Sequence, residues 1–388
     1  MGQSVILSKE LSQAEVTRYS RHILLPQVGL EGQRRLKGSS VLVVGTGGLG
    51  SPVSMYLAAA GVGRIGLIDY DVVDATNLQR QIVHGESTLG VPKVDSAAAR
   101  LLDLNPMIMV DRHYTALTRD NAMDILASYD VIVDGTDNFA TRYLLNDAAV
   151  LLGKPIVYGS VFRFEGQVSV FGMKDGPCYR CLQPVPPPPH TVPSCAQAGV
   201  FGVLPGTIGT IQATETLKLL LGIGEPLIGR LLLYDALDMT FDMIKLPKRR
   251  NCPVCGDQPT ITQLIDYEEF CGMPGHQSNV VSPVPEWTVQ EVKARLDANE
   301  PLILLDVREP YELMISHLDQ AVHIPISQMS ARWQEIPRDT TVVVFCRSGV
   351  RSANLITQLQ AAGYENLINM AGGINAWAKA IDPSLPGY

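Results

Sequence analysis

The stretch CRSGVRS places Cys346 close to two arginines, Arg347 and Arg351. The residues before it, TVVVF, read as a buried strand, and SANLITQL after it reads as a helix. Backbone N–H groups of such a loop can converge on one point, where the helix dipole adds positive potential. We therefore interpret Cys346 as a thiolate held by this loop. The alternative is a buried structural cysteine, which two adjacent arginines disfavour.

A glycine-rich turn, GTGGLGS, follows the apolar run SVLVVG and contains Gly45, Gly47, Gly48 and Gly50. Glycines let the backbone approach a phosphate, and the start of the next helix offers free N–H groups. Asp69, at the end of the next apolar run, has the spacing of an acid that binds ribose hydroxyls. The pattern indicates a nucleotide site, with a nicotinamide dehydrogenase as the obvious class. A glycine turn for tight packing is the alternative.

Polar residues beyond Asp69 favour a triphosphate over a nicotinamide ring. The segment DYDVVDATNLQRQIVHGESTLGVPKVDSA contributes Asn77, Arg80, Gln81 and Lys93. Asp137, in DGTDNFATR, comes after another strand end, where ligands bind in open α/β sheets. A carboxylate that faces phosphates normally acts through a metal, so we expect Mg²⁺. Alternatively, Arg80 and Lys93 are surface cations and Asp137 is a helix N-cap.

Two C-x-x-C pairs lie far apart in the chain: CYRC contains Cys178 and Cys181, and CPVC contains Cys252 and Cys255. Two such pairs together match a closed tetrahedral Zn²⁺ site. This site would be structural, because four protein ligands leave no open position. Two thioredoxin-like redox pairs are the alternative, but their usual helix and strand context is missing.

The elements that must position these residues form two α/β patterns. Strand-like runs at residues 40–45, 64–71 and 130–135 alternate with helix-like stretches, which predicts a Rossmann-like, doubly wound sheet. The proline-rich PVPPPPH interrupts this pattern and predicts a surface crossover loop. After Cys255 the periodicity weakens, as in a linker, and a second, smaller α/β pattern follows.

Composition limits the functional classes. The chain has 388 residues, 46% of them hydrophobic, and a formal net charge of −8, which argues against a nucleic-acid partner. Seven cysteines in so long a chain do not indicate a disulfide scaffold, so we expect a reducing, cytoplasmic location. We find neither a signal-peptide pattern nor an apolar run of membrane-spanning length, and expect no membrane partner.

Most of the chain before the linker resembles a known family. The segments RYSRHILL, GTGGLGS, DYDVVDATNLQRQ, GVPKV, DGTDNFATR and CYRCL are similar in order and spacing to those of the MoeB/ThiF adenylyltransferases. The resemblance implies ATP-dependent adenylation of the C-terminal Gly-Gly carboxylate of a small ubiquitin-like sulfur carrier protein. It also implies a homodimer, in which Arg21 of RYSRH would reach the phosphates in the other subunit.

The same resemblance assigns roles to the nucleotide-site residues. Asp69 would hold the ribose, Asp137 would hold magnesium, and the phosphates would be held by Asn77, Arg80 and Lys93. The resemblance also supports zinc at the paired cysteines. The expected cofactors are therefore ATP, Mg²⁺ and Zn²⁺.

Two further cysteines, Cys195 and Cys271, precede the C-terminal α/β pattern, and we expect a function only for the first. Cys195, in VPSCAQAGVFG, stands where family members carry a cysteine that can bond to the adenylated partner or to a sulfur intermediate. We include it among the candidate catalytic residues, with a dispensable cysteine as the alternative. Cys271, in the expected linker, is interpreted as incidental.

The C-terminal part resembles the rhodanese sulfurtransferases. Protein tyrosine phosphatases have a longer loop than the four residues that separate Cys346 from Arg351. LLDVREPYE, with Asp306 and Arg308, and AGGINAW strengthen the rhodanese resemblance, which implies that Cys346 carries a persulfide sulfur. The segment SHLDQA departs from the usual Gly-His-Ile-Pro-Gly-Ala turn, which puts the packing of that turn in doubt.

Together the two resemblances predict a rhodanese-fused MoeB-type enzyme. We expect an adenylation domain over residues 12–258, a linker over 259–283 and a rhodanese domain over 284–388. It would adenylate the carrier and then deliver sulfur from Cys346 to form a thiocarboxylate, for molybdenum cofactor, thiamine or tRNA thiolation. The sulfur donor would be a cysteine desulfurase or thiosulfate. The alternatives are a nicotinamide-dependent oxidoreductase with a regulatory rhodanese module and a non-catalytic carrier-binding scaffold.

Overall fold

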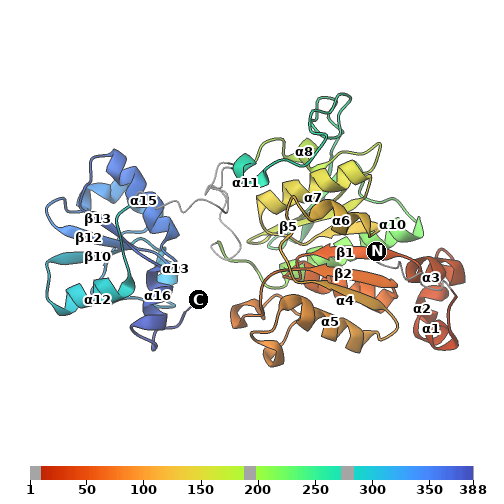
Figure 1. Ribbon diagram of the computed structural model, residues 1–388, viewed down its shortest axis with the longest axis horizontal. Coiled ribbons are helices and arrows are strands. Elements are labelled where there is room, and N and C mark those ends of the chain that lie inside the picture. Colours follow the sequence, from red (N-terminus) through yellow and green to blue (C-terminus); the bar gives the residue numbers. More distant parts are fainter. Residues whose placement is uncertain (1–9, 188–197, 272–283, 388) are drawn as a thin grey trace. The chain divides into compact units, whose positions relative to one another are not determined.

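The computed structural model describes residues 10–187, 198–271 and 284–387. The chain divides into two compact units, Met1–Gly275 and His276–Tyr388. Each unit contains a sheet flanked by helices (Figure 1). Among the helices of the described residues, none combines the length and apolarity that a membrane span requires.

The first unit contains an eight-stranded sheet of order β3-β2-β1-β4-β5-β6-β7-β8. The strands from β3 to β5 in this order are parallel, and β6, β7 and β8 extend the sheet by antiparallel pairing. Strand order reverses between β1 and β4, and open α/β sheets bind ligands at such a reversal. The strands are Ser40–Val44 (β1), Arg64–Ile68 (β2), Met109–His113 (β3), Val131–Asp134 (β4), Ile156–Phe162 (β5), Glu165–Phe171 (β6), Arg230–Asp235 (β7) and Thr240–Lys245 (β8).

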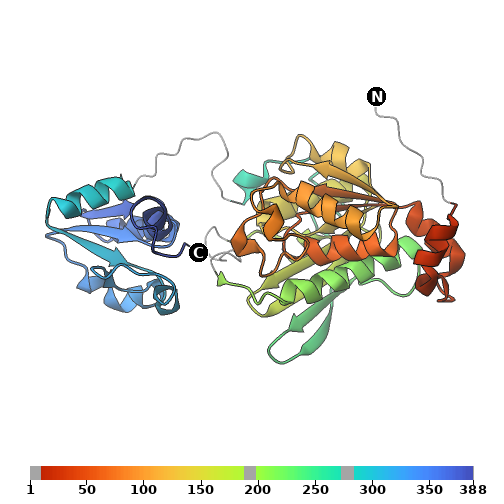
Figure 2. The ribbon, with the colours of Figure 1, turned by 90° about the horizontal axis from the view of Figure 1, so that it is seen from below.

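Helices cover both faces of this sheet, which confirms the doubly wound prediction (Figures 1 and 2). Side chains of β1 alternate between two cores: Val41 and Val43 join one, and Leu42 and Val44 join the other. This is the period of a strand buried on both faces. The first core includes residues of α4 (Gly50–Ala60), α5 (Lys93–Leu104) and α10 (Leu204–Leu221), and the second includes residues of α6 (Ala122–Ala127) and α7 (Phe139–Leu152).

Shorter elements complete the first unit. The first of them, α1, begins with a capping box in which Ser12 and Glu15 exchange side-chain-to-backbone hydrogen bonds. The short helices are α1 (Gln13–Arg18), α2 (Ser20–Ile23), α3 (Gly29–Lys37), α8 (Tyr179–Leu182), α11 (Tyr267–Phe270) and the 3₁₀ turns η1 (Ala75–Asn77) and η2 (Glu86–Thr88).

Part of the segment expected as a linker is packed against the first unit. Helix α11 contacts α7, and Tyr267 and Cys271 belong to the second of the two cores described above. The expectation of a linker from residue 259 therefore differs from the structure, because apolar side chains at sparse positions bury themselves without a recognisable period. Residues 272–283 lie outside the described part of the chain.

The second unit contains a five-stranded parallel sheet of order β11-β10-β12-β13-β9. Its central strand, β12, places Val342 and Val344 in one core and Val343 and Phe345 in the other. The strands are Glu286–Trp287 (β9), Leu302–Asp306 (β10), Val322–His323 (β11), Thr341–Phe345 (β12) and Leu367–Met370 (β13). The helices are α12 (Val289–Asp297), α13 (Pro310–Leu313), α14 (Ile326–Arg332), the 3₁₀ turn η3 (Trp333–Glu335), α15 (Val350–Ala361) and α16 (Gly373–Ala380).

Candidate functional site

The glycine loop joins β1 to α4 and packs tightly on the loop after β4. Gly45 has φ +86°, and a Cβ atom there would lie 2.9 Å from the carbonyl oxygen of Gly135. A Cβ atom at Gly50 would lie 1.9 Å from the carbonyl oxygen of Gly45. Both positions therefore require glycine for packing. Gly47 has more room, since the nearest atom to a Cβ there would be 3.6 Å away, on Gln81.

A cavity of about 530 Å³ opens beside the glycine loop. Its wall includes the C-terminal residues of β1 and β2, Val44 and Ile68, and Gly135, which follows β4. The cavity is thus at the reversal of strand order. Its lining contains seven of the residues predicted from the sequence, namely Gly45, Gly47, Gly48, Asp69, Arg80, Lys93 and Asp137.

Four other predicted residues are not part of the cavity wall. Gly50 is buried beneath the loop, and Gln81 is buried against Gly47. Asn77 accepts a hydrogen bond from the backbone N–H of Asp74 at 3.3 Å, within η1. Arg21 is exposed on α2.

Asp69 is held in one orientation by the glycine loop. One carboxylate oxygen, Oδ2, accepts hydrogen bonds from the backbone N–H of Thr46 at 2.9 Å and from its hydroxyl at 3.0 Å. The other, Oδ1, accepts from the backbone N–H of Asp71 at 3.0 Å. Charge-assisted bonds of this kind fix a side chain more firmly than neutral ones.

Lys93 is buried, so the interpretation of it as a surface cation does not hold. Its Nζ donates to the carboxylate of Asp71 at 2.8 Å. The sequence analysis did not single out Asp71, although the residue is part of the DYD segment. Arg80 is partly exposed and donates to the carbonyl oxygen of Thr76 at 3.0 Å.

Asp137 follows β4 at the cavity rim, and its side chain is exposed. The N-cap of α7 is Asn138, whose side chain accepts from the backbone N–H of Thr141 at 2.9 Å. Asn138 therefore caps α7, and the alternative interpretation of Asp137 as the helix N-cap is wrong. A carboxylate left exposed at the rim is available to a hard cation such as Mg²⁺.

Arg142 also lines the cavity, and the sequence analysis missed it. Its guanidinium lies 3.3 Å from the carboxylate of Asp134 and donates to the carbonyl oxygen of Thr136 at 2.8 Å. Burial disfavours its charge, but Tyr158 and Asp134 raise the pKa of Arg142 above its ordinary value. Arg142 is the last residue of the DGTDNFATR motif, and its place in that motif could have indicated it as a site residue.

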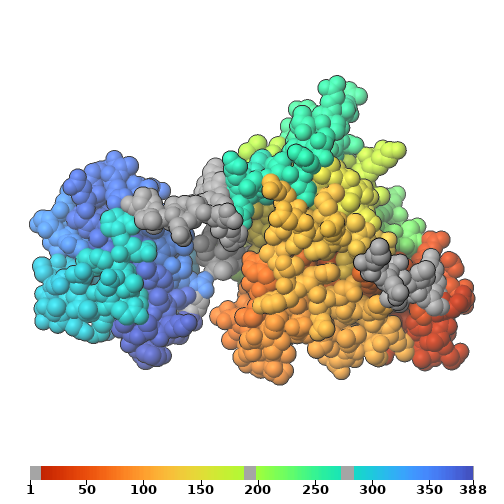
Figure 3. Space-filling view, viewed as in Figure 1, coloured from red at the N-terminus to blue at the C-terminus, as the bar shows by residue number. Residues whose placement is uncertain are grey.

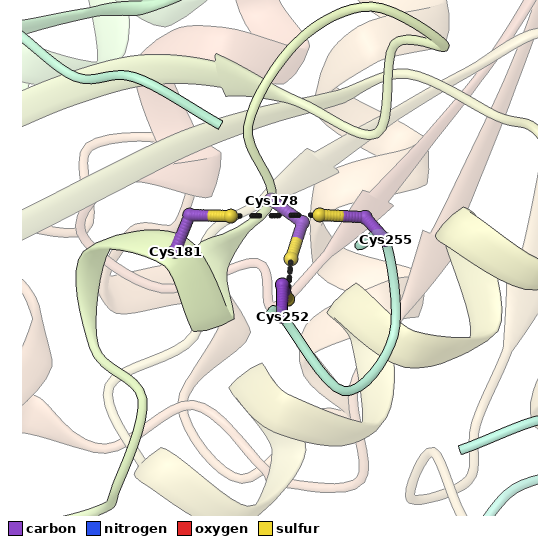
Figure 4. Close-up of side chains that lie close together, drawn as sticks. All are labelled: Cys178, Cys181, Cys252 and Cys255. Carbon is purple, nitrogen blue, oxygen red and sulfur yellow. Dashed lines mark hydrogen bonds between the residues drawn. The ribbon is translucent and has the colours of Figure 1, made fainter. Parts of the chain in front are cut away.

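The four paired cysteines meet in space, as the sequence predicted (Figure 4). Their sulfur atoms lie within 4.8 Å of one another. The distance is 3.5 Å for Cys178 to Cys252 and for Cys181 to Cys255, too long for disulfide bonds. Zinc–sulfur bonds of about 2.3 Å place the sulfurs of a tetrahedral site about 3.8 Å apart, so this donor set fits Zn²⁺.

A buried ion pair supports this cysteine cluster. Arg180, inside the CYRC motif, donates to both carboxylate oxygens of Asp147, at 2.9 and 2.8 Å. The hydroxyl of Tyr267 donates to the same carboxylate at 2.9 Å, and the ring of Phe270 lies 4.4 Å from the Arg180 guanidinium. The segment that carries Cys252 and Cys255, teal in Figure 3, projects at the surface of the first unit.

Cys271, interpreted from the sequence as incidental, is buried and lines the nucleotide cavity. Burial raises the pKa of this thiol, which lowers its fraction of thiolate. Cys195 lies outside the described residues.

Cys346 follows β12 and is buried at the start of the loop to α15. Its sulfur accepts a hydrogen bond from the backbone N–H of Gly349 at 3.2 Å, and the hydroxyl oxygen of Ser352 lies 3.5 Å away. Gly349 has φ +89° and is the N-cap of α15, and without a side chain it contributes only its backbone to this contact. The loop thus directs a backbone N–H at the sulfur, and the thiolate role of Cys346 stays a prediction.

The charge near Cys346 differs from the expectation. Arg351 forms two hydrogen bonds with Glu312, at 2.7 and 2.6 Å. Glu312 is buried and offsets the positive charge that the sequence analysis assigned to Arg351. This ion pair is difficult to predict from the sequence, because Glu312 lies in α13, far from the Cys346 loop along the chain.

The turn SHLDQA, whose packing the sequence left in doubt, is held by the LLDVR segment. Arg308 is fully buried with Asp306 and donates to the carbonyl oxygen of Ser316 at 2.9 Å. Leu318 of the same turn packs in the core beside α12 and α16. Arg308 and Asp306 therefore support the fold around the loop.

Comparison with known families defines the class of protein. Residues 19–254 match the ThiF family, and residues 288–380 match the Rhodanese-like domain. The chain belongs to the ThiF family and carries a C-terminal rhodanese domain. It is an adenylyltransferase and sulfurtransferase, which confirms the enzyme class and the fold predicted from the sequence.

Two relatives show the same domain arrangement over nearly the whole length. The probable adenylyltransferase/sulfurtransferase MoeZ of Mycobacterium tuberculosis is 47% identical, over 97% of this chain and 96% of its own. The adenylyltransferase and sulfurtransferase MOCS3 of Aedes aegypti is 46% identical, over 98% and 90%.

Solved structures of low identity support the fold of the first unit. Escherichia coli MccB with ATP has a TM-score of 0.54 at 23% identity, and covers 62% of this chain and 74% of its own. The crystal structure of PaaA has a TM-score of 0.53 at 22% identity, and covers 64% and 79%.

Proposed function

We propose that residues 12–258 use ATP to adenylate the C-terminal Gly-Gly carboxylate of a ubiquitin-like sulfur carrier protein, and that residues 284–388 supply the sulfur. The observation that carries this proposal is the cavity at the strand reversal, which gathers the glycine loop, Asp69, Lys93 and Asp137. The molybdenum cofactor pathway is the first candidate, given the relatives named above.

The adenylation step needs charge stabilisation and no side-chain nucleophile. The carrier carboxylate attacks the α-phosphorus of ATP, the bond to the β-phosphate oxygen breaks, and pyrophosphate leaves. Lys93 and Arg80 would stabilise the charge that moves onto pyrophosphate, and Asp69 would hold the ribose. Asp137 would hold Mg²⁺, which screens the phosphate oxygens during transfer.

The sulfur step uses a persulfide on Cys346. Its terminal sulfur attacks the acyl carbon, AMP leaves, and carrier and enzyme are joined through an acyl disulfide. Attack by a second thiol on the Cys346 sulfur then releases the carrier thiocarboxylate and leaves an enzyme disulfide. Cys195 is our candidate for that thiol, and a cysteine desulfurase for the source of the persulfide sulfur.

We further propose that Zn²⁺ occupies the cluster of four cysteines, which holds the segment after β8 against α8. We also propose a cytoplasmic location, which suits six described cysteines that form no disulfide bond. A homodimer would allow the exposed Arg21 to act in the cavity of the other subunit.

ATP–pyrophosphate exchange with a purified Gly-Gly carrier tests the adenylation proposal. Asp137→Ala should abolish exchange and leave thiosulfate sulfur transfer near normal. Asp175→Ala, which removes an exposed carboxylate outside the cavity, is the matched control. Normal exchange in Asp137→Ala would contradict the assignment, and NADH binding without exchange would favour the oxidoreductase instead.

The dimer proposal has its own test. Arg21→Ala and Asp137→Ala should each be inactive alone. In a mixed dimer, the subunit with intact Asp137 receives Arg21 from its partner, so mixing the two variants should restore exchange. Failure of the mixture, with dimers present by native mass spectrometry, would exclude action of Arg21 across subunits.

A further inference from the structure

His84 is buried between the glycine loop and α5, and neither the sequence analysis nor the proposed mechanism uses it. One ring nitrogen, Nε2, lies 3.1 Å from the carbonyl oxygen of Thr46. The other, Nδ1, lies 2.9 Å from the hydroxyl oxygen of Ser96. The imidazole therefore bridges two elements that are far apart in sequence.

The partners determine where the ring proton lies. A carbonyl oxygen only accepts hydrogen bonds, so Nε2 carries the hydrogen and donates to Thr46. In the neutral ring Nδ1 is then an acceptor, and the hydroxyl oxygen of Ser96 lies 2.9 Å both from Nδ1 and from the hydroxyl oxygen of Thr88. The charged groups that face the ring are Lys93 and Asp69. Burial lowers the pKa of His84, the positive charge of Lys93 lowers it further, and Asp69 raises it.

Each partner of His84 is linked to a residue that lines the proposed nucleotide cavity. Thr46 holds Asp69 through its backbone N–H and its hydroxyl. Ser96 lies one turn along α5, the helix that begins with Lys93. One ring nitrogen of His84 therefore contacts Thr46, which orients Asp69, the proposed ribose ligand. The other contacts Ser96, which lies on the same helix as Lys93, the proposed phosphate ligand.

The segment before His84 also touches the glycine loop. Gln81 packs against Gly47, and the side chain of Arg80 lies near Gly48. The backbone of this segment is hydrogen-bonded to that of His84: the N–H of His84 donates to the carbonyl oxygen of Gln81 at 3.0 Å. Movement of the imidazole would therefore shift this segment, which includes Arg80 in the cavity wall.

We propose that His84 is a positioning residue for the nucleotide, which fixes the glycine loop and α5 relative to each other so that Asp69 and Lys93 meet one ATP molecule. The inference rests on the proposed use of ATP in this cavity. His84 does not line the cavity itself, so its effect is transmitted through Thr46 and Ser96. The contact with Thr46 matters more, since Thr46 binds Asp69 directly.

Two conservative variants separate the two arms of the ring. Glutamine places an amide N–H near the position of Nε2 and can still donate to Thr46. Asparagine is shorter and reaches only the position of Nδ1, beside Ser96. His84→Ala should raise the KM for ATP by roughly tenfold, the value of one net hydrogen bond, with kcat changed much less. His84→Gln should recover most of the affinity, and His84→Asn should not.

His113→Ala is the matched control. Its ring is partly buried, whereas that of His84 is buried, and it bonds to the hydroxyl of Tyr129 at 2.9 Å, away from the glycine loop. Isothermal titration calorimetry of ATP on the full chain, with thermal denaturation of each variant, gives the decisive comparison. A role in stability alone predicts equal losses of Tm in the two alanine variants and unchanged ATP affinity, and that result would overturn the inference. Equal affinity of His84→Gln and His84→Asn would overturn it too. A wild-type chain that does not bind ATP would instead refute the proposed function.

Discussion

Around Cys346, hydrogen bonding and net charge come from different groups. The sulfur is contacted by Gly349 and Ser352, while the nearby Arg351 is paired with buried Glu312. Ser352 also lies 2.7 Å from Asn369, which connects the loop to β13. Because backbone N–H groups cannot be removed by a side-chain change, the loop should keep part of its hold on an anionic sulfur in most variants.

Replacing the sulfur itself gives the clearest prediction at this scale. Cys346→Ala should abolish sulfur transfer and leave ATP–pyrophosphate exchange intact, so acyl adenylate should accumulate. Ser352→Ala should reduce transfer by roughly tenfold or less, because the hydrogen bond from the backbone N–H of Gly349 remains. Intact mass spectrometry after incubation with a sulfur donor should map the added sulfur to Cys346. Added sulfur on Cys195, or thiocarboxylate formed by Cys346→Ala, would contradict the assignment.

Acid stability depends on the buried histidines. Burial lowers the pKa of both His84 and His113 below the ordinary value of 6.5. The unfolded chain then binds more protons, so stability is complete above pH 6.5 and falls as the pH drops toward the folded-state values. His84→Gln should flatten this fall in urea denaturation between pH 7.5 and 5.5. The control His317→Gln, at an exposed histidine, should retain the wild-type slope.

At the scale of elements, the turn from β13 to α16 supports the Cys346 loop. Gly373 has φ +58°, and a Cβ atom there would lie 2.3 Å from the carbonyl oxygen of Cys346. The backbone N–H of Ile374, at the start of α16, donates to that same carbonyl at 2.9 Å. The AGGINAW motif therefore serves as a backbone platform under the loop rather than as a ligand.

Gly373→Ala should displace the Cys346 loop and lower sulfur transfer at least tenfold, at a cost of about 1–3 kcal/mol in stability. Gly363→Ala is the matched control: its φ is +86°, but the nearest atom to a Cβ is 3.7 Å away, on Arg338. Both variants carry the backbone strain, and only Gly373→Ala meets the loop. Tryptophan fluorescence follows the unfolding, since all three tryptophans lie in the second unit. Equal sulfur transfer by the two variants would refute the platform role.

For the whole molecule, the chemistry is divided between two units with separate cores. The cysteine cluster belongs to the first unit, and Arg180 ties it to α11, the last helix described before the second unit. Metal binding energy is folding energy where the ligands come from distant segments. Removal of the metal should therefore weaken the first unit and leave the second unchanged.

Zinc analysis of the purified chain should find about one ion per chain, as expected of a single Cys₄ site. Cys252→Ser should lower the zinc content and the stability of the first unit, followed by far-UV circular dichroism. Tryptophan fluorescence should show an unchanged transition for the second unit. Cys271→Ser, at a buried cysteine outside the cluster, should retain zinc. Absence of zinc from undenatured wild-type protein would refute the site.

Spacing along the chain, over short segments, was the basis of the predictions made from the sequence. The glycine loop, the paired C-x-x-C motifs and the strand–loop–helix around Cys346 each combine residues close in sequence, whose geometry depends on one turn of backbone. Gly45, Cys178 and Cys346 were found this way, as was the doubly wound sheet, because strands buried on both faces read as continuous apolar runs.

Tertiary structure decided which charges meet. The partner of Arg351 is Glu312, and the partner of Arg180 is Asp147. The ring of His84 contacts Thr46 in the glycine loop. Each pair joins segments separated by many residues, and the sequence carries no period or spacing that links them. Burial selects these partners, since a charge or imidazole removed from water must be satisfied by whatever polar group the packing places beside it.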